Sequence, residues 1–121
     1  MAIEVTPQKR VGGQAEAWYL DVTWTQYDDG ESRYSFPWSS GLVLLIQNRD
    51  LALSRVVILV SVASGSLNRV QGSTITVPAG EVWTCGPLTS DGWNDGGFVH
   101  IDRSGAGNGT SSDIYLAGLV P

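Results

Sequence analysis

Residues 90–102, SDGWNDGGFVHID, concentrate the side chains of this sequence that could do chemistry. They include Asp91, Asp95 and His100, which is the only histidine in the chain. Acting together, a histidine and a carboxylate that orients it could support acid–base catalysis in a hydrolase. Such a hydrolase also requires a nucleophile, and none of the serines lies in a G-x-S-x-G turn of the kind that exposes one.

Metal binding fits this stretch poorly. A calcium loop starting at Asp91 would require an oxygen ligand where the sequence has Trp93. A zinc site needs several Cys, His or carboxylate ligands at matched spacing, and the chain has one cysteine and one histidine. We therefore expect no metal and no other cofactor. The Gly, Asn and Asp residues of DGWNDGG are typical of tight turns, so the stretch predicts a turn followed by a strand.

Three other candidates have structural interpretations. Cys85 alternates with Trp83 along a β-prone run, which predicts that both side chains pack in the core. Asp28 and Asp29 are adjacent acids of a DDG turn, not a spaced pair of glycosidase carboxylates. The glycines of GAGNG (105–109) precede an expected strand, whereas phosphate-binding loops of this kind lead into a helix. We predict no catalytic residue and no enzymatic activity.

The charge pattern disfavours two classes of partner. The net charge is −5, with one lysine and six scattered arginines. Binding to nucleic acid or to anionic lipid depends on clustered cations, so we expect neither partner. The N-terminus lacks the apolar segment of a secretory signal, which favours synthesis in a cytoplasm.

Short β-prone runs separated by turn residues predict an all-β fold. Sustained helical periodicity is absent from the sequence. We expect an antiparallel β-sandwich or a jelly-roll-like barrel of about eight strands, with an extended N-terminal arm. In domain terms, residues 1–16 form the arm and residues 17–121 a single β-sandwich domain. The expected strands are 18–25, 32–36, 42–47, 55–62, 73–77, 81–85, 97–102 and 113–119.

The arm is the first candidate for a contact with other proteins. Ile3, Val5 and Pro7 are its candidate buried anchors. Deleting residues 1–10 is expected to weaken attachment to a partner and to leave the fold intact.

Two expected strands are apolar on both faces, although a sandwich buries only one face of each strand. Leu42, Leu44 and Ile46 oppose Val43 and Leu45 along the first of them.

Along the second strand, Val56, Ile58 and Val60 oppose Val57 and Leu59. The second faces require cover from a loop, from the arm or from another subunit. Val43, Leu45, Val57 and Leu59 are therefore further candidate contact residues.

The tryptophans divide into two groups. Trp18, Trp24 and Trp83 are expected in the core. Trp38 follows Pro37, and Trp93 lies in a turn, so both are expected to be partly exposed. Exposed aromatic side chains anchor protein interfaces or stack on sugars.

Four segments resemble small all-β head proteins of tailed bacteriophages. They share a strand that ends in Asn, a V-P-A-G turn, a G-P before a loop and a D-G turn that opens a strand. The N-terminal third and the long loop RSGAGNGTSS depart from the pattern and leave the role in the head open. The segments are GLVLLIQN (41–48), STITVPAGEVWTCGPL (73–88), DGGFVHID (95–102) and SDIYLAGLVP (112–121).

The resemblance implies a capsid decoration (cement) protein. Such a protein is a non-enzymatic virion component, often a homotrimer, that sits on the outer surface of the capsid and clamps neighbouring capsomers. Its partners would be its own copies and the major capsid protein, after synthesis in the host bacterial cytoplasm. The alternatives are another virion component, such as a head–tail connector or tail protein, and a carbohydrate-binding β-sandwich module that stacks sugars on Trp38 and Trp93.

Overall fold

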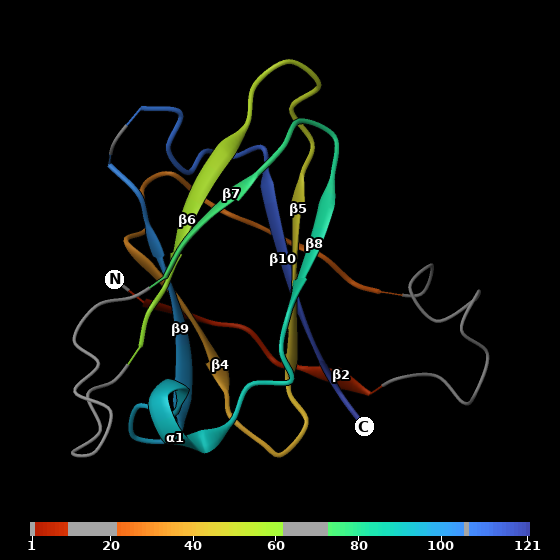
Figure 1. Cartoon of the computed structure of the whole chain (residues 1–121), viewed down its shortest axis with the longest axis vertical. Helices are drawn as coiled ribbons and strands as arrows, with labels where there is room; N and C mark the ends of the chain where they lie inside the picture. Colours follow the sequence, from red (N-terminus) through yellow and green to blue (C-terminus); the bar gives the residue numbers. More distant parts are fainter. Residues whose placement is uncertain (1, 10–21, 62–72, 106) are drawn as a thin grey trace.

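Over its described residues the chain folds into two β-sheets that pack face to face, with one short helix (Figure 1). The computed structural model describes residues 2–9, 22–61, 73–105 and 107–121. The all-β prediction is confirmed, and of the two architectures expected it is the sandwich, since the sheets do not close into a barrel. The elements are β1 (Ala2–Glu4), β2 (Gln8–Lys9), β3 (Thr25–Gln26), β4 (Arg33–Pro37), β5 (Val43–Asn48), β6 (Arg55–Leu59), β7 (Ser73–Val77), β8 (Val82–Cys85), α1 (Ser90–Trp93), β9 (Phe98–Arg103) and β10 (Ile114–Val120).

Each sheet has a simple strand order. The first sheet runs β1-β4-β9-β6-β7, and the second runs β2-β10-β5-β8, with β3 also paired to β10. Neighbouring strands are antiparallel except at β1–β4 and β2–β10, which are parallel. Seven expected strands correspond to β4–β10. The eighth, 18–25, is described from residue 22 on. There the prediction is wrong for Val22, Thr23 and Trp24, which are not in a strand, and only Thr25 belongs to β3.

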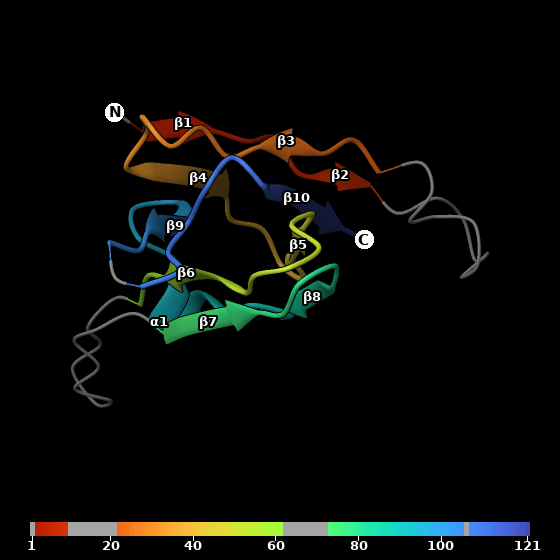
Figure 2. The same cartoon turned by 90° about the horizontal axis from the view of Figure 1, so that it is seen from above.

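Two segments of the chain each contribute an edge strand to both sheets. Residues 2–9 supply β1 to the first sheet and β2 to the second. Residues 73–85 supply β7 to the first sheet and β8 to the second. The two segments lie on opposite sides of the sandwich (Figure 2). We call the β1–β2 side the closed side and the β7–β8 side the open side.

The N-terminal segment belongs to the sandwich over its described part. Residues 2–9 lie along the two sheets instead of projecting from them, and the backbone N–H of Val5 donates to the Ser35 carbonyl at 2.7 Å. The Val5 side chain is buried in the core. We therefore correct the expectation that deleting residues 1–10 leaves the fold intact: the deletion should destabilise the sandwich. Residues 10–16 of the expected arm lie outside the described residues.

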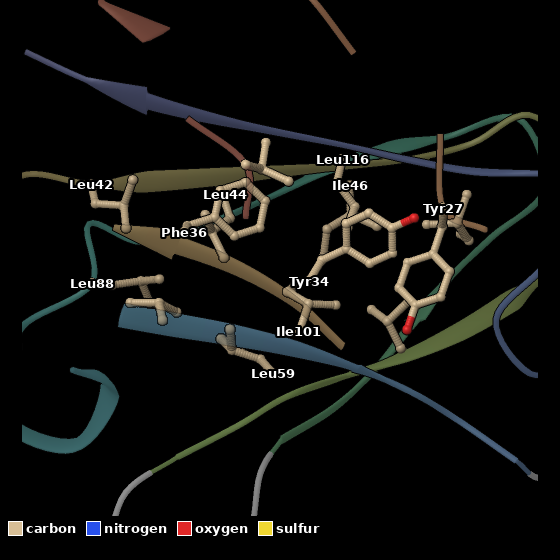
Figure 3. Packing of buried hydrophobic residues seen from close by; sticks show 14 of the residues in the cluster. Tyr27, Tyr34, Phe36, Leu42, Leu44, Ile46, Leu59, Leu88, Ile101 and Leu116 are labelled. Atoms are coloured by element: carbon tan, nitrogen blue, oxygen red, sulfur yellow. The ribbon is translucent and has the colours of Figure 1, made fainter. Parts of the chain in front are cut away.

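The core fills the space between the sheets, where each strand presents every second side chain (Figure 3). Each fully buried side chain of this size stabilises the fold by roughly 1.5–3 kcal/mol relative to exposure. The largest fully buried side chains include Tyr27, Phe36, Leu42, Leu44, Ile46, Ile101, Ile114 and Leu116.

The expected turns form, two of them through side-chain hydrogen bonds and one through a backbone hydrogen bond. Asp28 Oδ1 accepts from the Gly30 N–H at 2.8 Å, and Asn94 Oδ1 accepts from the Gly97 N–H at 2.7 Å. The PAG turn is closed by the Glu81 N–H, which donates to the Pro78 carbonyl at 3.1 Å. The four-residue α1 precedes the second of these turns and was not expected. Over the described residues, the structure contains no helix with the length and hydrophobicity to span a membrane.

Candidate functional site

The three candidate anchors of the expected arm serve the chain's own fold. Val5 is buried in the core, and Ile3 is partly buried against it. A Cβ added at Gly118 on β10 would lie 3.5 Å from the Cα of Pro7, so the segment runs close over this strand. We correct the prediction for Val5, because its side chain already lies inside the sandwich and cannot anchor a partner.

The outer face of β5 is covered by the same chain. Val43 and Leu45 point away from the main core, as expected from the alternation, and Leu45 is 3% exposed. Leu45 forms a second buried apolar cluster with Ala117 and Leu119 on β10. The partly buried side chains of Val43, Val22 and Trp24 pack against this cluster. Of the three kinds of cover expected (a loop, the arm or another subunit), the structure has a loop, formed by the residues just before β3.

The prediction that Val57 and Leu59 lie on the outer face of β6 is wrong. Val57 is fully buried and Leu59 is 4% exposed, and both face the main core. Their neighbours Val56 and Ile58 are half-buried on the opposite face. Since every residue from Val56 to Val60 is apolar, the alternation defines two faces without telling which one is inner. Val57 and Leu59 are therefore corrected to core residues.

Trp38 and Trp93 are half-buried and pack against the core. The Trp38 indole N–H also donates to the Leu88 carbonyl at 2.9 Å, which fixes the ring at the end of the sandwich. This arrangement disfavours the proposed pair of sugar-stacking platforms, which would need freely exposed ring faces.

The large apolar side chains that are exposed lie instead on the open side, with Trp83 on the inner face of β8 and its neighbour Val82 on the outer face. Among the described residues, the large hydrophobic side chains that are exposed are Leu51 (88%), Val82 (46%), Leu53 (44%) and Trp83 (42%). We call these four residues the open corner. Val82 and Trp83 lie on β8, and Leu51 and Leu53 lie on the β5–β6 loop, which runs beside the β7–β8 turn (Figures 1 and 2).

Trp83 corrects the expectation that it belongs to the core. It lies opposite Ile46 and faces the inside of the sandwich, as its alternation predicts. Because β8 is the last strand of its sheet, no strand of the described residues covers the outer flank of the indole. Its N–H donates to Glu81 Oε1 at 3.0 Å, so the polar atom of the ring has a partner within the chain.

A buried asparagine fixes the position of the β5–β6 loop, which carries Leu51 and Leu53 of the open corner. The amide of Asn48, which is fully buried, donates to the Leu53 carbonyl at 2.9 Å and to the Val77 carbonyl at 3.0 Å. Its Oδ1 accepts from the Asp50 N–H at 2.9 Å. One side chain therefore joins the β5–β6 loop to the end of β7.

Asp50 stabilises the same loop. Its carboxylate accepts from the backbone N–H groups of Ala52 and Leu53 and from Arg55, at 2.8, 3.1 and 2.7 Å. These hydrogen bonds, the backbone ones first, hold the pKa of Asp50 below its usual value. The Asp50 carbonyl also accepts from the Gly80 N–H, which docks the loop on the β7–β8 turn.

Within the described residues, the edge strands of the open side lack three of the usual protections against pairing: charged residues, proline and bulges. Exposed edges are normally guarded by charged residues, proline or bulges. β7 (STITV) and β8 (VWTC) contain no charged residue and no proline, and both pair with their neighbours in regular register. The open side therefore presents both apolar side chains and an unguarded backbone edge.

The only histidine forms a second cluster, on the outer face of the first sheet. His100 Nδ1 lies 2.7 Å from Ser35 Oγ, and its Nε2 lies 3.2 Å from Asp95 Oδ2. Ser35 and His100 are directly opposite on β4 and β9. Asp95 reaches the ring because the turn before β9 folds back on this strand. A hollow of about 300 Å³ beside them is lined by Glu4, Ser35, Phe98 and His100.

The residue types in this cluster match a serine–histidine–aspartate triad, but the surroundings do not favour acyl transfer. That chemistry needs hydrogen-bond donors where an oxyanion develops. Here the Glu4 carboxylate lines the hollow and the Asp95 carboxylate lies beside it, and both would repel negative charge. The Ser35 carbonyl is occupied by the Val5 N–H. The contacts of His100 with Ser35 and Asp95 instead link β4, β9 and the turn at Asp95. Asp91, the third residue of the hydrolase hypothesis, is exposed in α1.

The remaining chemical candidates have structural partners. The glycine-rich loop borders a hollow of about 520 Å³ with Arg55 and Arg103 in its wall. Arg55 pairs with Asp50, and Arg103 donates to the Asp29 carbonyl at 2.6 Å, so each guanidinium already has an acceptor. Cys85 is half-buried, and burial raises the pKa of its thiol, which opposes a role as nucleophile.

The described residues contain no group of three or more His, Cys, Asp or Glu side chains placed to hold a metal ion. Sequence reasoning missed both the open corner and the Ser35–His100 link, since each depends on strand order. Comparison of the chain with protein-family models, with curated proteins and with solved structures finds no match.

Proposed function

We propose that this chain is a non-enzymatic structural protein of a tailed-phage virion. It decorates the outside of the capsid and stabilises the shell by clamping neighbouring capsomers. Its partners are further copies of itself and the major capsid protein. The observation that carries the proposal is the open corner, because it places four exposed apolar side chains beside an unguarded sheet edge.

Two further features support this function. The sequence segments that resemble phage head proteins include both strands of the open side, within residues 73–88. The net charge of −5 suits the outer surface of a capsid better than the interior, where packaged nucleic acid would repel an acidic protein.

The copy number in purified particles tests the proposal. We expect gradient-purified particles from the source of this sequence to contain the chain in numbers comparable with the major shell protein, as measured by quantitative gel densitometry. A far smaller number would favour a connector or tail role over decoration. Absence of the chain from the particles would overturn the proposal.

Rebinding to particles that lack the chain tests the open corner itself. The double variant Leu51→Asp/Leu53→Asp places two charges in the corner and should lower particle occupancy at least about tenfold. The matched control Ser39→Asp/Ser40→Asp adds the same charges at two exposed positions between β4 and β5. Equal occupancy of the two variants would rule out the corner as the attachment surface.

A further inference from the structure

We propose that two copies of this chain associate through β8, which pairs with β8 of the second copy about a two-fold axis at Trp83. The result is one continuous sheet across both copies. The inference goes beyond the proposed function and does not depend on it, since it concerns the purified chain without particles.

The backbone of β8 has a defined set of groups that face outward. The Asn48 N–H donates to the Glu81 carbonyl, so Glu81 lies in a hydrogen-bonded pair with β5. Such pairs alternate along an antiparallel ladder, so Trp83 and Cys85 also direct their N–H and C=O groups toward β5. Val82 and Thr84 then direct theirs to the free edge.

The other edge of β5 agrees with this assignment. The Arg49 N–H donates to the Asp113 carbonyl of the neighbouring chain segment, so the odd-numbered residues of β5 face β10. The even-numbered residues therefore face β8. Consistent with this, the Leu42 carbonyl accepts from the Leu88 N–H, beyond the end of β8.

The outward groups of β8 are complementary to themselves. In an antiparallel pair of two β8 strands, Val82 of one copy can form a hydrogen-bonded pair with Thr84 of the other, and the reverse pair forms by symmetry. The four outward backbone groups of each strand then all find partners. Trp83 lies between these pairs, directly opposite Trp83 of the second copy, at the kind of site where side chains approach most closely.

The side chains favour a second copy as the occupant of this edge. Trp83 is 42% exposed and would pack against its own equivalent, with its N–H already satisfied by Glu81. Val82 would lie beside Thr84 of the other copy on the outer face. A chain of net charge −5 repels its own copies, and β8 allows close approach because it carries no charge.

Sedimentation of the purified chain over a concentration series tests the association. We expect a reversible shift to twice the monomer mass of 12.9 kDa. Thr84→Lys should weaken the dimer at least about tenfold, because an edge lysine opposes strand pairing. Thr6→Lys is the control, at an exposed position on the closed side. A monomer at all concentrations, a trimer, or an equal effect of both variants would overturn the inference.

A disulfide tests the register. Opposite residues in a non-hydrogen-bonded pair have Cα atoms about 4.5 Å apart, within the range that a disulfide spans. The variant Trp83→Cys/Cys85→Ser should therefore form a covalent dimer on mild oxidation, seen on a non-reducing gel. Thr6→Cys/Cys85→Ser carries the same number of thiols and should stay monomeric. Equal cross-linking in both variants, or none at residue 83, would contradict the two-fold pairing.

Discussion

The closed and open sides of the sandwich are built in the same way but differ in how much apolar surface they leave exposed. On each side, one continuous segment passes from an edge strand of the first sheet to an edge strand of the second. The closed-side segment buries Val5 in the core and carries Glu4 and Lys9 on its short strands. The open-side segment leaves Val82 and Trp83 exposed.

The difference lies in how the segments meet the sheets. The closed-side strands are only three and two residues long and are charged, both of which discourage further pairing. The open-side strands are longer, five and four residues, and uncharged. We infer that the closed side completes the fold of one chain, whereas the open side is left for a partner.

Matched valine substitutions on the two segments should give the largest difference. Val5→Asp places a charge in the core and should lower the free energy of unfolding by at least about 3 kcal/mol. Val82→Asp, at a half-exposed position, should change it by less than about 0.5 kcal/mol. Urea unfolding at low protein concentration measures both. Similar losses in the two variants would show that the sides do not differ.

Much of this fold could be predicted from the sequence because turn chemistry and alternation are local. The turns at Asp28, Asn94 and Pro78 form as expected. The strand expected at 97–102 forms as β9, where Val99 and Ile101 share one face and are both fully buried.

The candidate site could not be predicted in the same way, because it depends on tertiary pairing and strand order, which are not local. Ile3 and Val5 have the spacing of a strand, but only tertiary pairing with β4 distinguishes a docked segment from an arm. Trp83 has the pattern of a core residue and is exposed because its strand comes last in the sheet order. Likewise, the contact between Ser35 and His100 follows from the β4–β9 register, which no local motif encodes.

Removing the amide of Asn48 should loosen the open side from within. Asn48→Ala leaves the Leu53 and Val77 carbonyls without this donor and should cost about 1–3 kcal/mol of unfolding free energy. Hydrogen exchange should rise most in the β5–β6 loop and in β7. Asn94→Ala, which removes an exposed turn contact, should cost less than about 1 kcal/mol. If exchange rose equally in β1 and β4, Asn48 would not be specific to the open side.

The Asp50 carboxylate should make the open side sensitive to acid. Its pKa is lower in the folded state, so its contribution is present above the usual Asp value of about 3.8 and is lost as the pH falls through the folded pKa. Asp50→Asn removes this contribution. The stability difference between the wild type and this variant should therefore shrink as the pH falls from about 5 to below the usual Asp value. A difference that stays constant over this range would show that the charge does not stabilise the loop.

Leu51→Ser should have the smallest effect on stability. The side chain is 88% exposed, so its removal should change the free energy of unfolding by less than about 0.5 kcal/mol. It should nevertheless reduce binding of a hydrophobic dye to the native protein, because it removes the most exposed apolar group of the open corner. A loss above about 1 kcal/mol would mean that Leu51 packs within its own chain, as Val5 does. In that case the open side, like the closed side, would use its apolar side chains within its own chain and would leave less apolar surface for a partner.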